Sequence, residues 1–175
     1  PGYPVPQDLL MQAGFRAGFV ELGKLDLSFD AWLYHPQIPQ LIDLARAFPG
    51  TPIILDHCGG PLGLGPYAGK TDAVFAAWKA SIDELATCDN VTVKTGGLGM
   101  RINGYDFHEP SDPPTSDRLA EAWRPYIDTC IEAFGADRCM FESNFPVDKG
   151  SYSYPIYWNA CKKLASGASA TEKTD

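Results

Sequence analysis

The sequence predicts an α/β fold in which four parallel strands alternate with helices. Short apolar runs of strand length are separated by longer segments whose apolar residues recur at helical spacing, and the two kinds alternate along the whole chain. Each connection is long enough to return the chain to the same end of a parallel sheet. Such units could form a small open doubly wound sheet or half of an eight-unit barrel, and periodicity alone does not choose.

Two patterns predict the strands. Residues 25–34 alternate apolar and polar side chains with a period of two, which indicates a strand with unlike faces. Residues 51–56 form an apolar run that suits a strand covered on both faces, and residues 90–95 and 138–143 complete the set.

Helical spacing of apolar residues predicts the other elements. The predicted helices span residues 9–22, 36–48, 74–85, 119–134 and 154–164. Glycines or a Pro-Gly pair follow several of them and are typical helix stops.

Composition limits the functions to consider. With 175 residues, 45% of them hydrophobic, the chain can bury one core, so we expect a single domain over residues 1–175. The net charge is −8 and the basic residues are scattered, which argues against nucleic acid as a partner. No run of about 18 apolar residues could span a bilayer. We therefore expect a soluble protein.

The cysteines and the chain ends indicate context. Five cysteines occur without a Cys-x-x-Cys spacing, which favours a reducing, cytoplasmic compartment over a zinc or redox motif. The chain begins without Met and ends on a polar stretch, residues 171–175, that would suit the start of another helix. We expect the sequence to be cut from a longer protein.

Polar side chains gather where the predicted strands end, which is where α/β enzymes carry functional residues. His57 follows an apolar run directly and could be a metal ligand, a general base or an oxyanion donor. It could equally cap its own strand, bonded to a carboxylate such as Asp56. Asn144 follows the fourth strand and could orient a water or a carbonyl, although an amide is a weaker metal ligand than a carboxylate.

Strand alternation groups further residues. Asp30 and Trp32 share one face of their strand, and Glu142 and Asn144 are expected to point the same way. Asp30 and Trp32 could line a ligand cavity, or form a salt bridge and part of the core. Lys94, within an apolar strand, must pair with an anion or extend to solvent.

Three polar residues outside the regular strands are also candidates. His35 could contact substrate, lie on the surface or cap a helix. Arg101 and His108, in a long loop, could clamp an anionic substrate, because guanidinium groups bind carboxylates with two parallel hydrogen bonds. Solvated loop charges are the alternative.

At these strand ends the sequence resembles the amidohydrolase-related family of (β/α)8-barrel hydrolases, on the side that contains sugar-lactone and pyrone-lactone hydrolases. The matching stretches are residues 27–37 (LSFDAWLYHPQ), 54–61 (ILDHCGGP), 90–98 (NVTVKTGGL) and 138–146 (RCMFESNFP), in family order. The resemblance implies that the chain is the C-terminal half of the barrel, with strands five to eight.

The resemblance also implies catalytic roles. His57 matches the histidine that ends strand six, and Asn144 matches the end of strand eight, where many relatives carry an Asp that activates water. The strand-one His-x-His pair lies outside this chain, and Trp32 stands where metal-binding relatives often have His. The metal-independent lactonases are therefore the better comparison, and no metal ligand or cofactor is assigned, although the full-length protein could hold zinc or manganese.

The resemblance implies a small-molecule substrate, and the implied activity is hydrolysis of a lactone or similar cyclic ester, carboxylated or sugar-derived. Water would attack a carbonyl polarised by His57, while Lys94 or Arg101 holds a substrate carboxylate. The alternatives are a metal-dependent decarboxylase of the same superfamily and a small doubly wound module that binds a ligand without turnover.

A half barrel would leave both outer strands without a neighbour, and open edges pair readily with other chains. We therefore expect the chain alone to be inactive and to associate with copies of itself. The set expected to face the barrel axis is Phe29 or Trp32 with Ile53, Leu55, Val93 and Met140.

Overall fold

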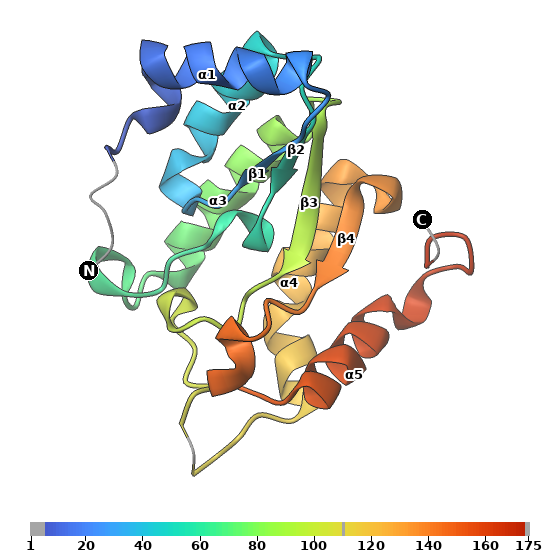
Figure 1. Ribbon diagram of the computed structural model, residues 1–175. Coiled ribbons are helices and arrows are strands. Elements are labelled where there is room, and N and C mark those ends of the chain that lie inside the picture. Colours follow the sequence, from blue (N-terminus) through green and yellow to red (C-terminus); the bar gives the residue numbers. More distant parts are fainter. Residues whose placement is uncertain (1–5, 110, 174–175) are drawn as a thin grey trace.

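A computed structural model describes residues 6–109 and 111–173, and it contains one parallel four-stranded sheet in the order β1-β2-β3-β4 (Figure 1). The strands are β1 (Phe29–Ala31), β2 (Ile53–Leu55), β3 (Val91–Gly96) and β4 (Cys139–Glu142). Their order follows the chain without a reversal. A doubly wound sheet requires such a reversal, so the structure favours the barrel-like alternative.

Five α-helices alternate with these strands in the described part of the chain. They are α1 (Ala13–Lys24), α2 (Ile38–Ala47), α3 (Thr71–Leu85), α4 (Ser116–Phe134) and α5 (Tyr154–Leu164). In Figure 1, α2, α3 and α4 lie behind the sheet, and α1 packs on β1 through Phe19 and Phe29, whose ring centroids are 5.3 Å apart. The predicted α/β alternation is confirmed.

The register of the sheet separates a covered face from an open face. Ala31, Leu55 and Val93 lie side by side in register and are at most 2% exposed, because the helices cover them. The next row places Lys94 beside Met140, which is 42% exposed. The expectation that Ile53, Leu55 and Val93 share a face with Met140 was wrong, since the helix-covered face holds most of the apolar side chains.

The first strand is shorter than its alternating pattern predicts. Leu25 and Asp26 end α1: Leu25 N donates to the carbonyls of Glu21 and Leu22, and Asp26 has a left-handed φ of 54°. Leu25 and Leu27 remain 67% and 49% exposed. The alternation over residues 25–34 therefore reflects a helix end and a short strand rather than one long strand.

In the parts of the chain that the structure describes, no helix is both long enough and apolar enough to cross a membrane.

Candidate active site

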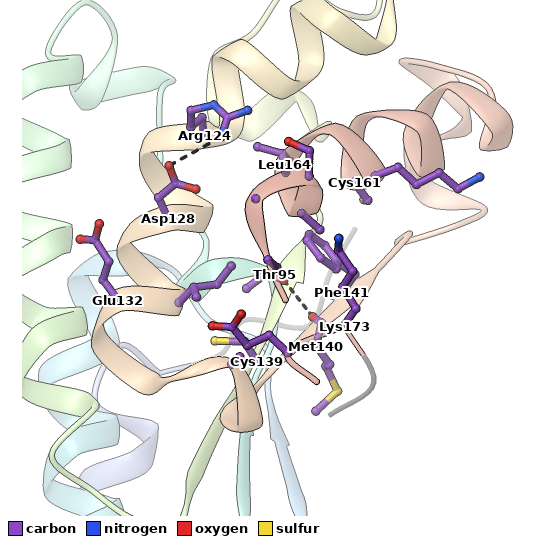
Figure 2. Close-up of a pocket in the computed structure, with 18 of the residues that line it drawn as sticks. Thr95, Arg124, Asp128, Glu132, Cys139, Met140, Phe141, Cys161, Leu164 and Lys173 are labelled. Atoms are coloured by element: carbon purple, nitrogen blue, oxygen red, sulfur yellow. Dashed lines mark hydrogen bonds and ion pairs between the residues drawn. The ribbon is translucent and has the colours of Figure 1, made fainter. Parts of the chain in front are cut away.

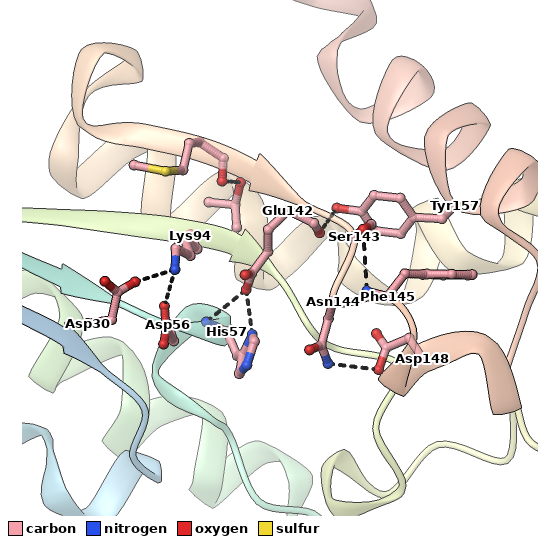
Figure 3. A network of polar contacts seen from close by, with 12 residues as sticks. Asp30, Asp56, His57, Lys94, Glu142, Ser143, Asn144, Phe145, Asp148 and Tyr157 are labelled. Carbon is pink, nitrogen blue, oxygen red and sulfur yellow. Dashed lines mark hydrogen bonds and ion pairs between the residues drawn. The ribbon is translucent and has the colours of Figure 1, made fainter.

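The carboxyl ends of the four parallel strands bring polar side chains together at one end of the sheet (Figure 3). They belong to the last residues of each strand or to the first residues after it. The set is Asp30, Asp56, His57, Lys94, Glu142 and Asn144. His57 and Asn144 thus lie at the same end of the sheet, just after β2 and β4, and β3 lies between these two strands.

His57 is held by Glu142, the last residue of β4. The Glu142 Oε1 atom lies 3.0 Å from the backbone N of His57 and 2.5 Å from its ring Nδ1. An ionised carboxylate only accepts hydrogen bonds, so Nδ1 is the donor, and the lone pair of a neutral imidazole in this arrangement is on Nε2. No described residue forms a hydrogen bond with Nε2. A carboxylate does bond to His57, but it is Glu142 and not Asp56, the example considered from the sequence. His57 thus has the arrangement of a base oriented by a carboxylate.

Two glycines leave room for this pair. A Cβ on Gly97 would lie 2.5 Å from Nδ1 of His57, and a Cβ on Gly96 would lie 2.1 Å from the carbonyl oxygen of Glu142. Gly97 also has a left-handed φ of +66°. The Gly96-Gly97 pair at the end of β3 therefore allows the flanking strand ends to meet across it.

The turn that carries His57 has an unusual backbone. His57 and Cys58 both have left-handed φ values, 56° and 52°, which cost on the order of 1 to 3 kcal/mol each for residues other than glycine. The indole Nε1 of Trp78 donates to the carbonyl oxygen of Cys58 at 2.7 Å within the core. This hydrogen bond from α3 helps to stabilise the turn that presents the imidazole.

Lys94 forms ion pairs with two carboxylates. Its Nζ contacts Asp30, and it lies 2.7 Å from Oδ1 of Asp56. Burial alone would lower the pKa of Lys94, but the hydrogen bonds and charges of Asp30 and Asp56 outweigh burial and raise that pKa above its usual value. The sequence left open whether Lys94 pairs with an anion or extends to solvent, and the structure shows the ion pairs.

Asn144 belongs to a second polar set, with Asp148 and Tyr152. Its φ of 51° is left-handed, a region that Asn tolerates better than most residues. Its Nδ2 donates to Oδ1 of Asp148 at 3.0 Å, and the Tyr152 hydroxyl donates to Oδ2 of Asp148 at 2.5 Å. Burial raises the pKa of Asp148, while the hydrogen bonds from Tyr152 and Asn144 act in the opposite sense.

Trp32 lies beside the imidazole. Its ring centroid is 6.4 Å from that of His57, with the planes at 82°, and the residue is 53% exposed. The site therefore has an exposed aromatic wall next to its base. Asp30, whose side chain is half exposed, lies on the same strand end.

His35, Arg101 and His108 lie outside this cluster of contacts. His35 is buried, and its Nδ1 accepts from the backbone N of Leu62 at 3.2 Å, so it fixes the loop after β2. Arg101 is exposed in the loop after β3. His108 is partly buried in the same loop, and its Nε2 lies 3.4 Å from Glu109.

A large cavity in the described structure lies away from these strand-end residues. It measures about 980 Å³ and lies between β4, α4 and α5 (Figure 2). Its lining includes Arg124, Asp128, Cys139, Met140 and Cys161 and none of His57, Lys94, Glu142 or Asn144. The open strand-end face, rather than this cavity, carries the polar groups that could do chemistry.

The described residues offer no ready metal site. No three His, Cys, Asp or Glu side chains among them come together as ligands. Nδ1 of His57 is already bonded to Glu142, and Asp56 is paired with Lys94. Over residues 6–109 and 111–173, these donors are therefore engaged within the chain.

Sequence reasoning missed the partners of the predicted residues. Strand alternation predicted only that Glu142 points the same way as Asn144. A charged residue at the end of an apolar strand could have marked Glu142 as a site residue. Asp56 was considered for His57 and instead neutralises Lys94. Asp148 lies in a short 3₁₀ turn, Val147–Gly150, where no periodicity marks it, yet it is 1% exposed.

Comparison with known proteins places the chain in a family. The amidohydrolase family model matches residues 1–175, so the chain belongs to the amidohydrolase family. The family resemblance inferred from the strand ends is confirmed.

Individual relatives cover most of the chain. It is 39% identical over 160 residues to the uncharacterised protein y4mH of Sinorhizobium fredii, covering 91% of this chain and 47% of that protein. It is 30% identical over 139 residues to an L-fucono-1,5-lactonase of Burkholderia ambifaria, covering 76% of this chain and 41% of the lactonase. The chain therefore spans about half the length of these relatives.

Solved structures agree on the fold. A crystal structure of an amidohydrolase from Burkholderia multivorans with bound HEPES superposes with a TM-score of 0.81 at 26% identity, covering 96% of this chain and 56% of that one. A second crystal form of an amidohydrolase from that organism contains bound zinc and superposes with a TM-score of 0.80 at 26% identity, covering 96% of this chain and 55% of that one. The fold class is confirmed as part of an amidohydrolase barrel, while the numbering of the strands as five to eight stays a prediction.

Proposed function

We propose that the protein carrying this chain hydrolyses the ring ester of a neutral, sugar-derived lactone. The observation that supports this most is the His57–Glu142 pair at the carboxyl ends of the strands, with Nε2 of His57 free of partners among the described residues. Relatives named L-fucono-1,5-lactonase support the same class of substrate.

His57 acts as the general base in this proposal. The oxygen of a water molecule bonds to the lactone carbonyl carbon while one water proton passes to Nε2. The ring C–O bond then breaks, and its oxygen takes the proton back from Nε2, so that lactone and water yield a hydroxy acid. Glu142 stabilises the imidazolium that exists between these steps, because its carboxylate faces Nδ1. A base at Nε2 replaces the carbonyl-polarising role expected from the sequence.

The charges at the site favour a neutral substrate. Four acidic side chains lie at the strand ends, those of Asp30, Asp56, Glu142 and the buried Asp148. The ammonium group of Lys94 is already paired with Asp30 and Asp56. A dicarboxylate would meet net repulsion, whereas the hydroxyl groups of a sugar lactone can donate to an exposed carboxylate such as Asp30.

Two further residues are proposed to contact the substrate. Trp32 offers an exposed aromatic face beside His57 for the apolar side of a sugar ring. Arg101, exposed in the loop after β3, remains a substrate-binding candidate. Lys94 acts indirectly in this proposal, by holding Asp30 and Asp56 in place.

The test is a substrate panel with the full-length protein. Neutral sugar 1,5- and 1,4-lactones and 2-pyrone-4,6-dicarboxylate are compared by the proton that each ring opening releases. We expect kcat/KM for a neutral sugar lactone to exceed that for the dicarboxylate by at least about tenfold, the equivalent of about 1.4 kcal/mol. Preference for the dicarboxylate would refute the substrate class.

Two other results would favour the alternatives. Lactone binding without turnover would support a binding module. Loss of activity on chelation, with an equivalent of zinc or manganese retained through dialysis by elemental analysis, would support a metal-dependent hydrolase or decarboxylase. We expect turnover that survives chelation, because Nδ1 of His57 is bonded to Glu142 and Asp56 is paired with Lys94.

A further inference from the structure

The orientation of the Asn144 amide is fixed by its contact with Asp148. Asp148 is 1% exposed, and its carboxylate accepts from Nδ2 of Asn144 at 3.0 Å and from the Tyr152 hydroxyl at 2.5 Å. An ionised carboxylate has no proton to donate, so only the nitrogen of the amide can face it. The oxygen of the amide is turned the other way, toward His57 (Figure 3).

We propose that Asp148 is a positioning residue, which holds Asn144 so that its amide oxygen accepts a hydrogen bond from the attacking water. This inference rests on the hydrolysis proposed above. The water must give one proton to His57 and have its second proton held by another acceptor, and Oδ1 of Asn144 supplies that acceptor. A flipped amide would instead present two N–H donors to the water and compete with the base.

The surroundings of Asp148 make it a rigid support. Tyr152 is 5% exposed, and its ring stacks on Tyr157 with centroids 6.0 Å apart. The Tyr157 hydroxyl in turn donates to the carbonyl oxygen of Glu142. A Cβ on Gly99 would lie 2.4 Å from the Tyr152 hydroxyl, so the loop after β3 closes tightly over this ring. One aromatic cluster therefore supports both Asn144 and the residue that orients His57.

The decisive variant is Asp148→Asn in the full-length protein. An amide of the same shape at position 148 can donate or accept, so Asn144 loses its preferred orientation while the packing is kept. We expect kcat on a neutral sugar lactone to fall about 10- to 100-fold, as for loss of a hydrogen bond to a charged group, with KM within about twofold. Tyr152→Phe keeps the Asp148–Asn144 bond and is expected to lower kcat less than about threefold.

An exchange of the two residues separates positioning from simple structural support. Asn144→Asp alone sets two carboxylates against each other and should lose activity. The double variant Asn144→Asp/Asp148→Asn restores one donor, one acceptor and an oxygen facing His57, and should recover most of the lost kcat. Wild-type kcat in Asp148→Asn, or a folded double variant no more active than Asn144→Asp, would overturn the proposal.

A second readout needs no turnover. In full-length protein labelled with ¹⁵N-asparagine, the side-chain amide resonance of Asn144 is assigned by its loss in Asn144→Asp. Its protons should be protected from solvent exchange in the wild type and exchange at least about tenfold faster in Asp148→Asn, at an unchanged unfolding midpoint. An unprotected wild-type amide contradicts the positioning role. Absence of lactone turnover, with this protection intact, contradicts only the proposed hydrolysis.

Discussion

The contact between Glu142 and Nδ1 of His57 determines what the imidazole can do. Glu142 fixes the tautomer and the direction of the ring, which leaves Nε2 available toward the open face of the sheet. Lys94, beside them, has both of its carboxylate partners and no excess charge to offer a substrate. The site therefore offers one base, Nε2 of His57, beside a lysine whose charge is already neutralised by two carboxylates.

His35 gives a pH dependence of stability. Burial lowers the pKa of His35, and a hydrogen bond with the backbone of Gly60 acts in the opposite sense. Its folded-state pKa lies below the unfolded value of about 6.5, so its stabilising effect is complete above that pH and is lost as the pH falls toward the folded pKa. Protonation would also remove the acceptor that Leu62 N uses.

Urea unfolding of the full-length protein at pH 7.5 and 5.5 tests this. One proton contributes a slope of at most about 1.4 kcal/mol per pH unit. His35→Gln should unfold more easily than wild type at pH 7.5, and the difference should shrink at pH 5.5. An equal or larger difference at pH 5.5 would mean that His35 is not held neutral in the fold.

The strand-end rule located the charged and aromatic residues of the site but not their partners. The sequence marks His57 and Asn144 because each follows an apolar run. It marks Lys94 as a charge within an apolar strand, and Asp30 through the alternation of its strand. The Glu142 partner of His57 is 85 residues away along the chain, and no local pattern encodes that contact. His35, just past its strand, was a candidate for substrate contact, the surface or a helix cap, but the loop after β2 folds over it and buries it.

The Gly96-Gly97 pair at the end of β3 leaves room for the neighbouring strand ends to meet. Gly97→Ala would set a methyl group 2.5 Å from Nδ1 of His57 at a φ of +66°. We expect this variant to lose most activity, and to lose on the order of 1 to 3 kcal/mol of stability from the backbone alone. Activity on a neutral sugar lactone and thermal unfolding are the measurements.

Gly14→Ala provides the matched control. Gly14 lies within α1, and a Cβ there would meet nothing within 4 Å. Because Gly14 is the second residue of α1, alanine there should stabilise the protein by less than the roughly 0.5 to 1 kcal/mol of an interior site and leave activity unchanged. Equal behaviour of the two variants would show that the strand ends do not approach each other across Gly97.

Element types were predictable, but their ends were less so. The helix predicted over residues 154–164 matches α5 in full, because its apolar spacing is uninterrupted. The strand predicted over residues 25–34 shrinks to β1, because alternation cannot reveal that Leu25 still bonds to the last turn of α1. The faces of β2 and β3 also depended on where the helices pack, which periodicity does not specify.

The whole molecule has two open sheet edges in its described part. β1 pairs only with β2, and β4 only with β3. The core between sheet and helices is nevertheless complete, since Trp78, Trp123 and Leu55 are at most 1% exposed. We expect the isolated 175 residues to form secondary structure but to associate through these edges, with no lactone turnover.

Sedimentation of the isolated chain, with a lactone assay on the same sample, tests this expectation. Met140 and Trp32, exposed on the open face, add apolar surface that favours association at about 25 cal/mol per Å² buried. A monodisperse monomer that hydrolyses a lactone would show that these residues form an independent enzyme.

The central claim is that His57, oriented by Glu142, is the base of a lactone hydrolase, and one set of rates tests it most directly. Full-length wild type, His57→Gln and Glu142→Gln are compared on the same neutral sugar lactone. We predict measurable turnover for wild type, a fall of about 100-fold or more for His57→Gln, and an intermediate fall for Glu142→Gln, which keeps an acceptor but loses the charge. Wild-type rates in a folded His57→Gln variant would contradict the account.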